Sequence, residues 1–282
     1  NASLAPSRGV IDDFRLTAET SRLKTVVIIL AVAAIYFTTT KIGLIVPLTT
    51  EQATLIWPLS SPTGIAVVAV VLLGERIWPA IMLGAFATYI TAYMPVVTAA
   101  GIALGSTLEA LCAAWLLHRL VGPIINLNRL KDTWGLFLLA GFLSPMIGAS
   151  ISVASLCLQG LQPWADFGRR WLDWWLGGAL DVYVIVPALL VWLQKNHYYE
   201  KTRSVLNESI IFTVALLAYC VTVMFHPVFL STAKYLIFPF IIYAALRFGQ
   251  RGTTLVTLAA FGIEVTAIAL NNQSVIRWEL SE

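Results

Sequence analysis

The sequence predicts an all-α fold, a polytopic transmembrane helical bundle of about eight to ten spans. Composition is the first observation behind this prediction. Of the 282 residues, 59% are hydrophobic and only 12% are charged, whereas soluble domains carry about 25% charged residues. The second observation is that the apolar residues gather in runs close to the ~20 residues that a helix needs to cross the hydrocarbon core.

Nine apolar runs, each bounded by charges or by Pro and Gly, are the predicted spans. They cover residues 24–46, 56–73, 77–93, 96–117, 133–157, 171–193, 207–226, 232–247 and 252–270. The chain is thus divided into a polar lead (1–23), an integral membrane domain (24–270) and a polar tail (271–282).

Basic residues mark one side of the membrane, because Lys and Arg are concentrated in alternate loops. These loops contain Arg22, Lys24, Arg76, Arg119, Arg129, Lys131, Lys195, Lys201, Arg203, Arg247 and Arg251. The N-terminus is therefore predicted to be cytoplasmic. Nine spans from an inside start would leave the tail outside. Either one span is miscounted or a further span follows; we favour the second, in which the tail is an outer loop that leads back through the membrane.

The second span has an unusual entry between Trp57 and Gly64. Pro58 and Pro62 remove backbone donors, and Ser60 and Ser61 place hydroxyl groups where a lipid-facing helix would carry Leu. Irregular backbone at membrane depth persists only where protein buries it or a wet cavity borders it. We therefore expect this entry to lie inside the bundle, near one membrane surface, and to bind or gate something.

Three carboxyl groups fall in the middle of predicted spans: Glu109, Asp181 and Glu264. A charge at the bilayer centre costs about 2.5–3.5 kcal/mol on insertion scales, so such residues face the bundle interior. One interpretation is structural, with each acid hydrogen-bonded between helices. The other is a binding site for a ligand, a cation or a proton. The residues alone leave both open.

Small and polar residues surround these acids at helical spacing. Gly101, Gly105 and Glu109 share one face of the fourth span, and a stripe that includes Ser144 and Ser152 follows the fifth. Small residues let helices approach closely, which indicates helix–helix seams. Asp173 and Trp175 are predicted at the outer mouth of a pocket. The predicted ligand-binding residues are Trp57, Ser60, Ser61, Glu109, Asp173, Trp175 and Asp181.

Motifs of catalysis and cofactor binding are absent from the sequence. It has no Walker loop, dinucleotide fingerprint, His-Glu-x-x-His or Gly-x-Ser-x-Gly. Cys112, Cys157 and Cys220 lie far apart in apolar runs, without metal-ligand spacing. We predict no catalytic residue, no metal, no cofactor and no nucleic-acid partner, and an enzyme ranks last among the function classes.

Five stretches carry a family resemblance. They are Trp57-Pro58 to Gly64-Ile65-Ala66, L-L-G-E-R-I-W-P-A-I-M-L-G-A-F, A-L-G-S-T-L-E-A-L-C-A-A-W-L-L, W-W-L-G-G-A-L-D-V-Y-V-I-V-P-A-L-L-V-W, and Y-L-I-F-P-F-I-I-Y-A-A-L-R-F-G-Q-R-G. In this order they resemble the membrane-associated sensor domain of the first MASE class, over residues 25–270.

The chain departs from the family's usual pattern at three places. Ser60-Ser61-Pro62-Thr63-Gly64 stands where the family has Trp-Pro-Pro-Ala/Ser-Gly, and Gly105-Ser106-Thr107 stands for Gly-Asn-Thr. In W-W-L-G-G-A-L-D the family's acid has moved from position 178 to Asp181, which is nearly one helical turn and keeps a carboxylate on the same face.

The resemblance implies a sensory input domain in the inner membrane of bacteria, followed by a cytoplasmic histidine kinase or diguanylate cyclase module. The expected partners are membrane lipid, a small-molecule ligand of unknown identity, that module in cis, and a second copy in a homodimer. The alternative function is a small-molecule transporter or its membrane substrate-binding component, which broken helices and midplane acids also suit.

Overall fold

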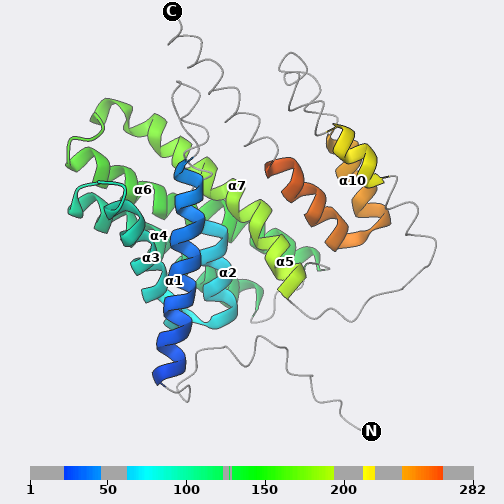
Figure 1. Cartoon of the computed structure of the whole chain (residues 1–282), viewed down its shortest axis with the longest axis horizontal. Coiled ribbons are helices and arrows are strands. Elements are labelled where there is room, and N and C mark those ends of the chain that lie inside the picture. The colour runs from blue at the N-terminus through cyan, green and yellow to red at the C-terminus, as the bar shows by residue number, and fades with distance from the viewer. Residues whose placement is uncertain are drawn as a thin grey trace, which may run out of the picture. The chain divides into compact units, whose positions relative to one another are not determined.

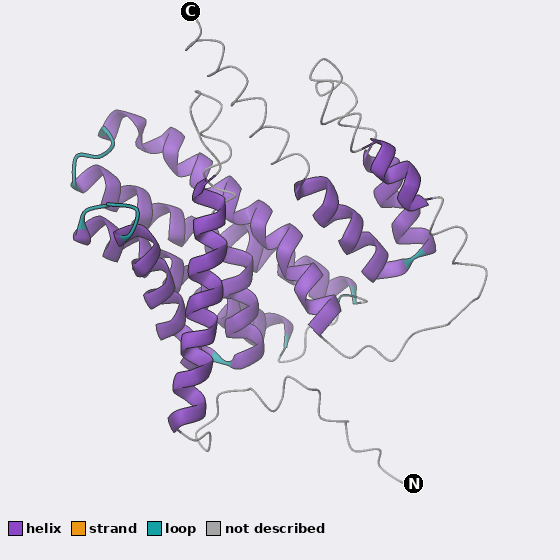
Figure 2. Cartoon of the chain, viewed as in Figure 1, coloured by secondary structure: helices purple, strands orange, loops and turns teal. Residues whose placement is uncertain are grey.

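The computed structural model describes residues 22–45, 62–122, 127, 129–193, 212–219 and 237–262 (Figures 1 and 2). Regular structure within these ranges is helical throughout, with no strand, which confirms the predicted all-α class. The chain divides into two compact units, one of Asn1–Val46 with Glu51–Gln194 and one of Pro47–Thr50 with Lys195–Glu282.

The first unit contains eleven helical segments in the part of the chain that the structure describes. They are α1 (Arg22–Ile45), α2 (Thr63–Leu73), the 3₁₀ turn η4 (Glu75–Ile77), α3 (Trp78–Ile90), α4 (Val96–Leu116), the π-helical η5 (Leu117–Val121), α5 (Leu130–Gly135), the π-helical η6 (Leu136–Leu143), α6 (Ser144–Leu158), the 3₁₀ turn η7 (Trp164–Asp166) and α7 (Phe167–Leu193).

Among the described residues, four continuous helical stretches are long and apolar enough to cross a membrane: Arg22–Leu44, Val96–Val121, Leu130–Leu158 and Trp164–Leu193. They contain 23, 26, 29 and 30 residues, and at about 1.5 Å per residue each exceeds the ~30 Å hydrocarbon core. They correspond to the predicted spans 24–46, 96–117, 133–157 and 171–193. The last begins earlier than predicted, at Trp164 instead of residue 171.

Prolines and glycines set the limits of the shorter elements. Pro62 and Pro95 directly precede α2 and α4, and Pro79 lies in the first turn of α3, where a missing N–H removes no helical bond. Gly74 ends α2 with φ 96°, a conformation that favours glycine. The structure therefore interrupts the helix at Glu75–Ile77, between the predicted spans 56–73 and 77–93, and α3 starts immediately afterwards.

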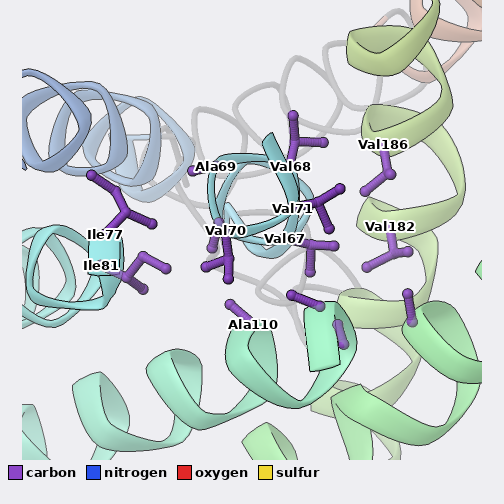
Figure 3. Packing of buried hydrophobic residues seen from close by; sticks show 14 of the residues in the cluster. Val67, Val68, Ala69, Val70, Val71, Ile77, Ile81, Ala110, Val182 and Val186 are labelled. Atoms are coloured by element: carbon purple, nitrogen blue, oxygen red, sulfur yellow. The ribbon is translucent and has the colours of Figure 1, made fainter. Parts of the chain in front are cut away.

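Helix α2 is the centre of the apolar core. Its contacts are with α4 and α7 on two sides, and Figure 3 shows its valines surrounded by side chains of neighbouring helices. The labelled core residues are Val67, Val68, Ala69, Val70, Val71, Ile77, Ile81, Ala110, Val182 and Val186. With 11 residues, α2 is about 16 Å long, or half of the hydrocarbon core. The residues that precede Pro62 lie outside the described part.

The fifth predicted span changes helix type before Pro145. Residues Leu136–Leu143 are π-helical and Ser144–Leu158 are α-helical. A proline cannot donate to the carbonyl one turn earlier and its ring crowds that carbonyl. The wider π-helical turns accommodate this, and π segments of this kind occur often at functional sites. The structure thus places the irregularity of this span on the N-terminal side of Pro145.

The second unit contains α10 (Ile237–Arg247) and helical residues 212–219 and 249–262. Phe212 stacks on Tyr243 and meets Phe240 and Phe248 edge-on, with ring centroids 5.2–5.7 Å apart. Aromatic packing thus joins residues 212–219 to α10 and to the turn that follows it. The predicted spans 207–226, 232–247 and 252–270 lie partly outside the described residues, as does Glu264.

A glycine on the seam between α1 and α3 provides a test of the packing. A Cβ on Gly84 would lie 2.9 Å from the Ala33 carbonyl oxygen and 3.0 Å from Tyr36 Cβ. We expect Gly84→Val to lower the free energy of unfolding by about 1–3 kcal/mol through overpacking. Thermal unfolding of the protein in detergent measures the effect. Gly168→Val is the matched control, since that helical glycine has no neighbour within 4 Å; equal losses in both variants would contradict the packing.

Candidate functional site

The structure brings two of the predicted acids together in the interior of the first unit. Glu109 of α4 is 3% exposed and Asp181 of α7 is 5% exposed. Each lies near the middle of its long helix, and the two carboxyl groups interact electrostatically. This placement agrees with the expectation that mid-span acids face the bundle interior rather than lipid.

The N-terminus of α2 points at this pair. The Gly64 N–H donates a hydrogen bond of 2.6 Å to Asp181 Oδ2, and the Thr63 hydroxyl donates to the Glu109 carboxyl group. The first N–H groups of a helix have no partner within it and carry a partial positive charge. Asp181 therefore caps α2 from a neighbouring helix. This start of α2 lies level with the middle of α7. The predicted entry residues 57–61 lie outside the described residues.

Close approach of α2 and α7 depends on Gly64. A Cβ at this position would lie 2.7 Å from Ile185 Cβ and 2.9 Å from the Asp181 carbonyl oxygen. Any side chain here would push the two helices apart and break the hydrogen bond to the carboxylate. Glycine is thus required by space, in a helix whose other residues are mostly Val and Ala.

Glu109 occupies a slot formed by glycines on two other helices. A Cβ on Gly148 of α6 would overlap Glu109 Oε2, and a Cβ on Gly178 of α7 would lie 3.1 Å from Oε1 and 3.1 Å from Pro145 Cβ. Within the described residues, Oε1 has no hydrogen-bond partner. A buried carboxyl oxygen without a partner is unfavourable, which marks it as a position where something else can bind.

Along the seam between α4 and α6, beyond Glu109, glycines of α4 face serines of α6. Gly105 faces Ser152, whose Oγ would lie 2.9 Å from a Cβ on that glycine, and Gly101 faces Ser155. Ser155 donates to the Ile151 carbonyl of its own helix. Ser152 is 0% exposed, and its Oγ has no hydrogen-bond partner in the described part of the chain. It lies about one helical turn from Glu109 along the seam.

Two tyrosines complete the cluster, and sequence reasoning missed both. Tyr36 of α1 is 1% exposed, is hydrogen-bonded to Ser106, and interacts electrostatically with Glu109 and Asp181. Tyr89 of α3 is buried and interacts with Glu109. For Tyr36 the available signal was a phenol in the middle of the first span, directly after a long apolar run, since a buried tyrosine hydroxyl generally has a polar partner.

Asp173 and Trp175 are placed elsewhere on α7. Trp175 Nε1 donates to the Phe142 carbonyl at 2.9 Å, and its ring stacks on Trp171. Asp173 is half-buried, with Oδ2 lacking a partner among the described residues. No described contact joins either residue to Glu109 or Asp181. Their ligand-binding role remains a prediction, as it does for Trp57, Ser60 and Ser61, which lie outside the described residues.

The arrangement favours binding of positive charge over catalysis. Two carboxyl groups, hydroxyl groups and one helix N-terminus meet, and no basic side chain contributes to the surroundings of either acid in the described region. The described residues contain no group of three or more His, Cys, Asp and Glu that could hold a metal ion. They pair no nucleophile with a base at this site.

A helical membrane bundle that encloses a polar cluster between its spans is typical of integral membrane receptors and transport proteins, which bind ligands or ions there. A comparison with family models narrows this class, because the MASE1 model matches residues 26–277, nearly the whole chain. The protein belongs to the MASE1 family, whose members are membrane sensory input domains rather than catalytic domains. The comparisons with curated proteins and with solved structures found no match.

The glycine slot around Glu109 can be tested with a designed clash. We expect Gly148→Ala to lower the free energy of unfolding by about 1–3 kcal/mol, because the added methyl group displaces the carboxyl group. Adding Glu109→Asp, which shortens that side chain by one methylene, should recover part of the loss, with an interaction energy of about 0.5–3 kcal/mol in a double-mutant cycle. Detergent unfolding measures all three variants. Additive losses would show that residue 148 does not border Glu109.

The role of Trp175 can be separated into packing and ligand binding. Trp175→Phe removes the donor to the Phe142 carbonyl, so we expect a loss of about 1 kcal/mol in unfolding free energy. The control is Trp164→Phe, because Trp164 is exposed and its indole makes no hydrogen bond in the described structure. Unchanged stability together with altered signalling in Trp175→Phe would instead support the predicted ligand role.

Proposed function

We propose that this chain is the sensory input domain of a bacterial inner-membrane signalling protein. In this proposal, a ligand that binds around Glu109 and Asp181 changes the packing of the bundle. The change regulates a cytoplasmic histidine kinase or diguanylate cyclase module that follows the domain. The protein acts as a homodimer, because kinases and cyclases generally work in pairs. Membership of a sensory family supports the proposal at the level of class.

One observation supports the location of the sensing site. Glu109 of α4, Asp181 of α7 and the first residues of α2 meet in a single buried cluster. Whatever binds there changes the interactions of three helices at once. A ligand shifts a conformational equilibrium only by its difference in affinity for the two states. A cluster shared by three helices gives such a difference whenever the helices move relative to one another.

A transporter is the second candidate, and the same helix end favours it. Secondary transporters place half-length helices near the midplane with the N-terminus directed at an anionic group. The N-terminus of α2 has this arrangement toward Asp181. The two candidates differ in what crosses the membrane: a transporter moves its ligand, whereas a sensor only binds it.

Conservative changes of the two acids test the sensor in the full-length protein in its native membrane. Glu109→Gln and Asp181→Asn keep the shape of each side chain and remove the ionisable group. We expect the output of either variant to stay constant and no longer respond to the stimulus. Output is measured as kinase phosphorylation or cyclic dinucleotide synthesis. The expected difference from the parent is about fivefold or more, which is the lower end of usual coupling between sites.

The control is Asp166→Asn, which removes an exposed acid in η7 and should leave output unchanged. Parent-like output from both cluster variants at equal membrane abundance would refute this site. Uptake of a small solute by vesicles containing the purified parent, abolished in the same variants, would favour the transporter.

A further inference from the structure

The candidate site also indicates the class of its ligand. We propose that Glu109 and Asp181 together hold one small monovalent cation, a proton or a sodium ion, and that its occupancy is the stimulus. The signalling role of the cation rests on the proposed function, whereas the cation-binding site itself does not.

The balance of charge inside the cluster supports one bound positive charge. Each element around the acids contributes known groups: Tyr36 from α1, Thr63 from α2, Tyr89 from α3, Glu109, Ser106 and Cys112 from α4, Ser152 from α6 and Asp181 from α7. Two carboxylates would bring two negative charges. The N-terminus of α2 offsets about half of one. Since charge at this depth is strongly unfavourable, one further positive charge is needed.

Unsatisfied oxygen atoms mark where this charge binds. Glu109 Oε1 has no hydrogen-bond partner in the described part of the chain, although Glu109 is buried. Ser152 Oγ, about one turn along the same seam, is also buried and unpartnered within that part. The Gly148 carbonyl oxygen lies on the same seam, 3.1 Å from the Cβ position of Gly105. Carboxylate, hydroxyl and carbonyl oxygens are the ligands that small hard cations prefer.

The space around Glu109 suits an ion and excludes an organic ligand. At Gly148 not even a methyl group fits without displacing the carboxyl group, and at Gly178 one would lie 3.1 Å from Oε1. A metabolite would need a pocket several residues wide. A proton needs no space of its own, and a sodium ion needs far less room than a metabolite.

Binding and release of the cation would act on three helices. With the cation bound, Glu109 and Asp181 attract it together, and α4, α7 and α2 stay close. With the cation released, the carboxylates repel each other, and α2 is held to α7 by apolar packing and by the hydrogen bond from Gly64 to Asp181. We therefore expect the occupied form to be the more tightly packed one.

The experiment uses the full-length protein in lipid nanodiscs, with sodium chloride exchanged for choline chloride at constant ionic strength over a series of pH values. Thermal unfolding reports stabilisation by a bound cation, which rises with its concentration above the dissociation constant. Infrared difference spectra report the carbonyl stretch of a protonated carboxyl group. The variants are Glu109→Gln, Asp181→Asn and Ser152→Ala, with Asp166→Asn as the matched acid control.

If the cation is sodium, we expect saturable stabilisation that decreases as protons compete for the site. Glu109→Gln and Asp181→Asn should each weaken the sodium affinity by about tenfold or more, since each removes a charge within a few ångströms of the ion. Ser152→Ala should weaken it less. For a proton we expect a carbonyl band that appears on acidification, is independent of sodium, and is lost in Glu109→Gln. The inference is overturned if stability is the same in sodium and choline and no carbonyl band depends on Glu109 or Asp181.

Measurement of output in the same samples separates this inference from the proposed function. Cation binding without any change in kinase or cyclase output would leave the site in place and refute the sensing role. An output that responds to a stimulus, without sodium-dependent stabilisation and without a carbonyl band that depends on Glu109 or Asp181, would support the sensor and refute the cation site.

Discussion

The interaction on which the rest of the bundle depends is the hydrogen bond from Gly64 to Asp181. Helix α2 begins level with the middle of its neighbours, where lipid offers no acceptor for its first N–H groups. Asp181 supplies this acceptor at 2.6 Å, and the charge of the carboxylate also complements the partial positive charge of the helix end. A helix only 11 residues long can therefore form at the centre of the core.

The small residues of the neighbouring seams follow from this arrangement. A polar cluster at membrane depth must be enclosed by protein, so the helices around it have to approach closely. Gly64 allows α2 to reach α7, while Gly148 and Gly178 bring α6 and α7 up to Glu109. Gly105 continues the seam beside Ser152. Away from the cluster the core is filled by valine, isoleucine and alanine, which need no such spacing (Figure 3).

Sequence reasoning could identify the elements but not the depth at which they end. Long apolar runs gave the spans of α1, α4 and α7, because helix length and bilayer thickness are related by simple geometry. Spacing of four residues placed Glu109 on a seam. The partner across that seam depends on crossing angles, so neither the electrostatic interaction of Glu109 with Asp181 nor the role of Tyr36 could be derived. The entry before Gly64 showed broken backbone without showing how deep it lies.

The displaced acid in W-W-L-G-G-A-L-D now has a physical explanation in this chain. At position 178, where the family resemblance places it, a side chain would begin 3.1 Å from Glu109 Oε1 and would crowd that carboxyl group. One turn later, at Asp181, the carboxylate still interacts with Glu109 and also reaches the N–H of Gly64. Moving the acid therefore keeps a pair of carboxyl groups in the cluster while connecting the pair to α2. Because α2 packs on both α4 and α7, a change of one charge in this pair acts directly on the centre of the core.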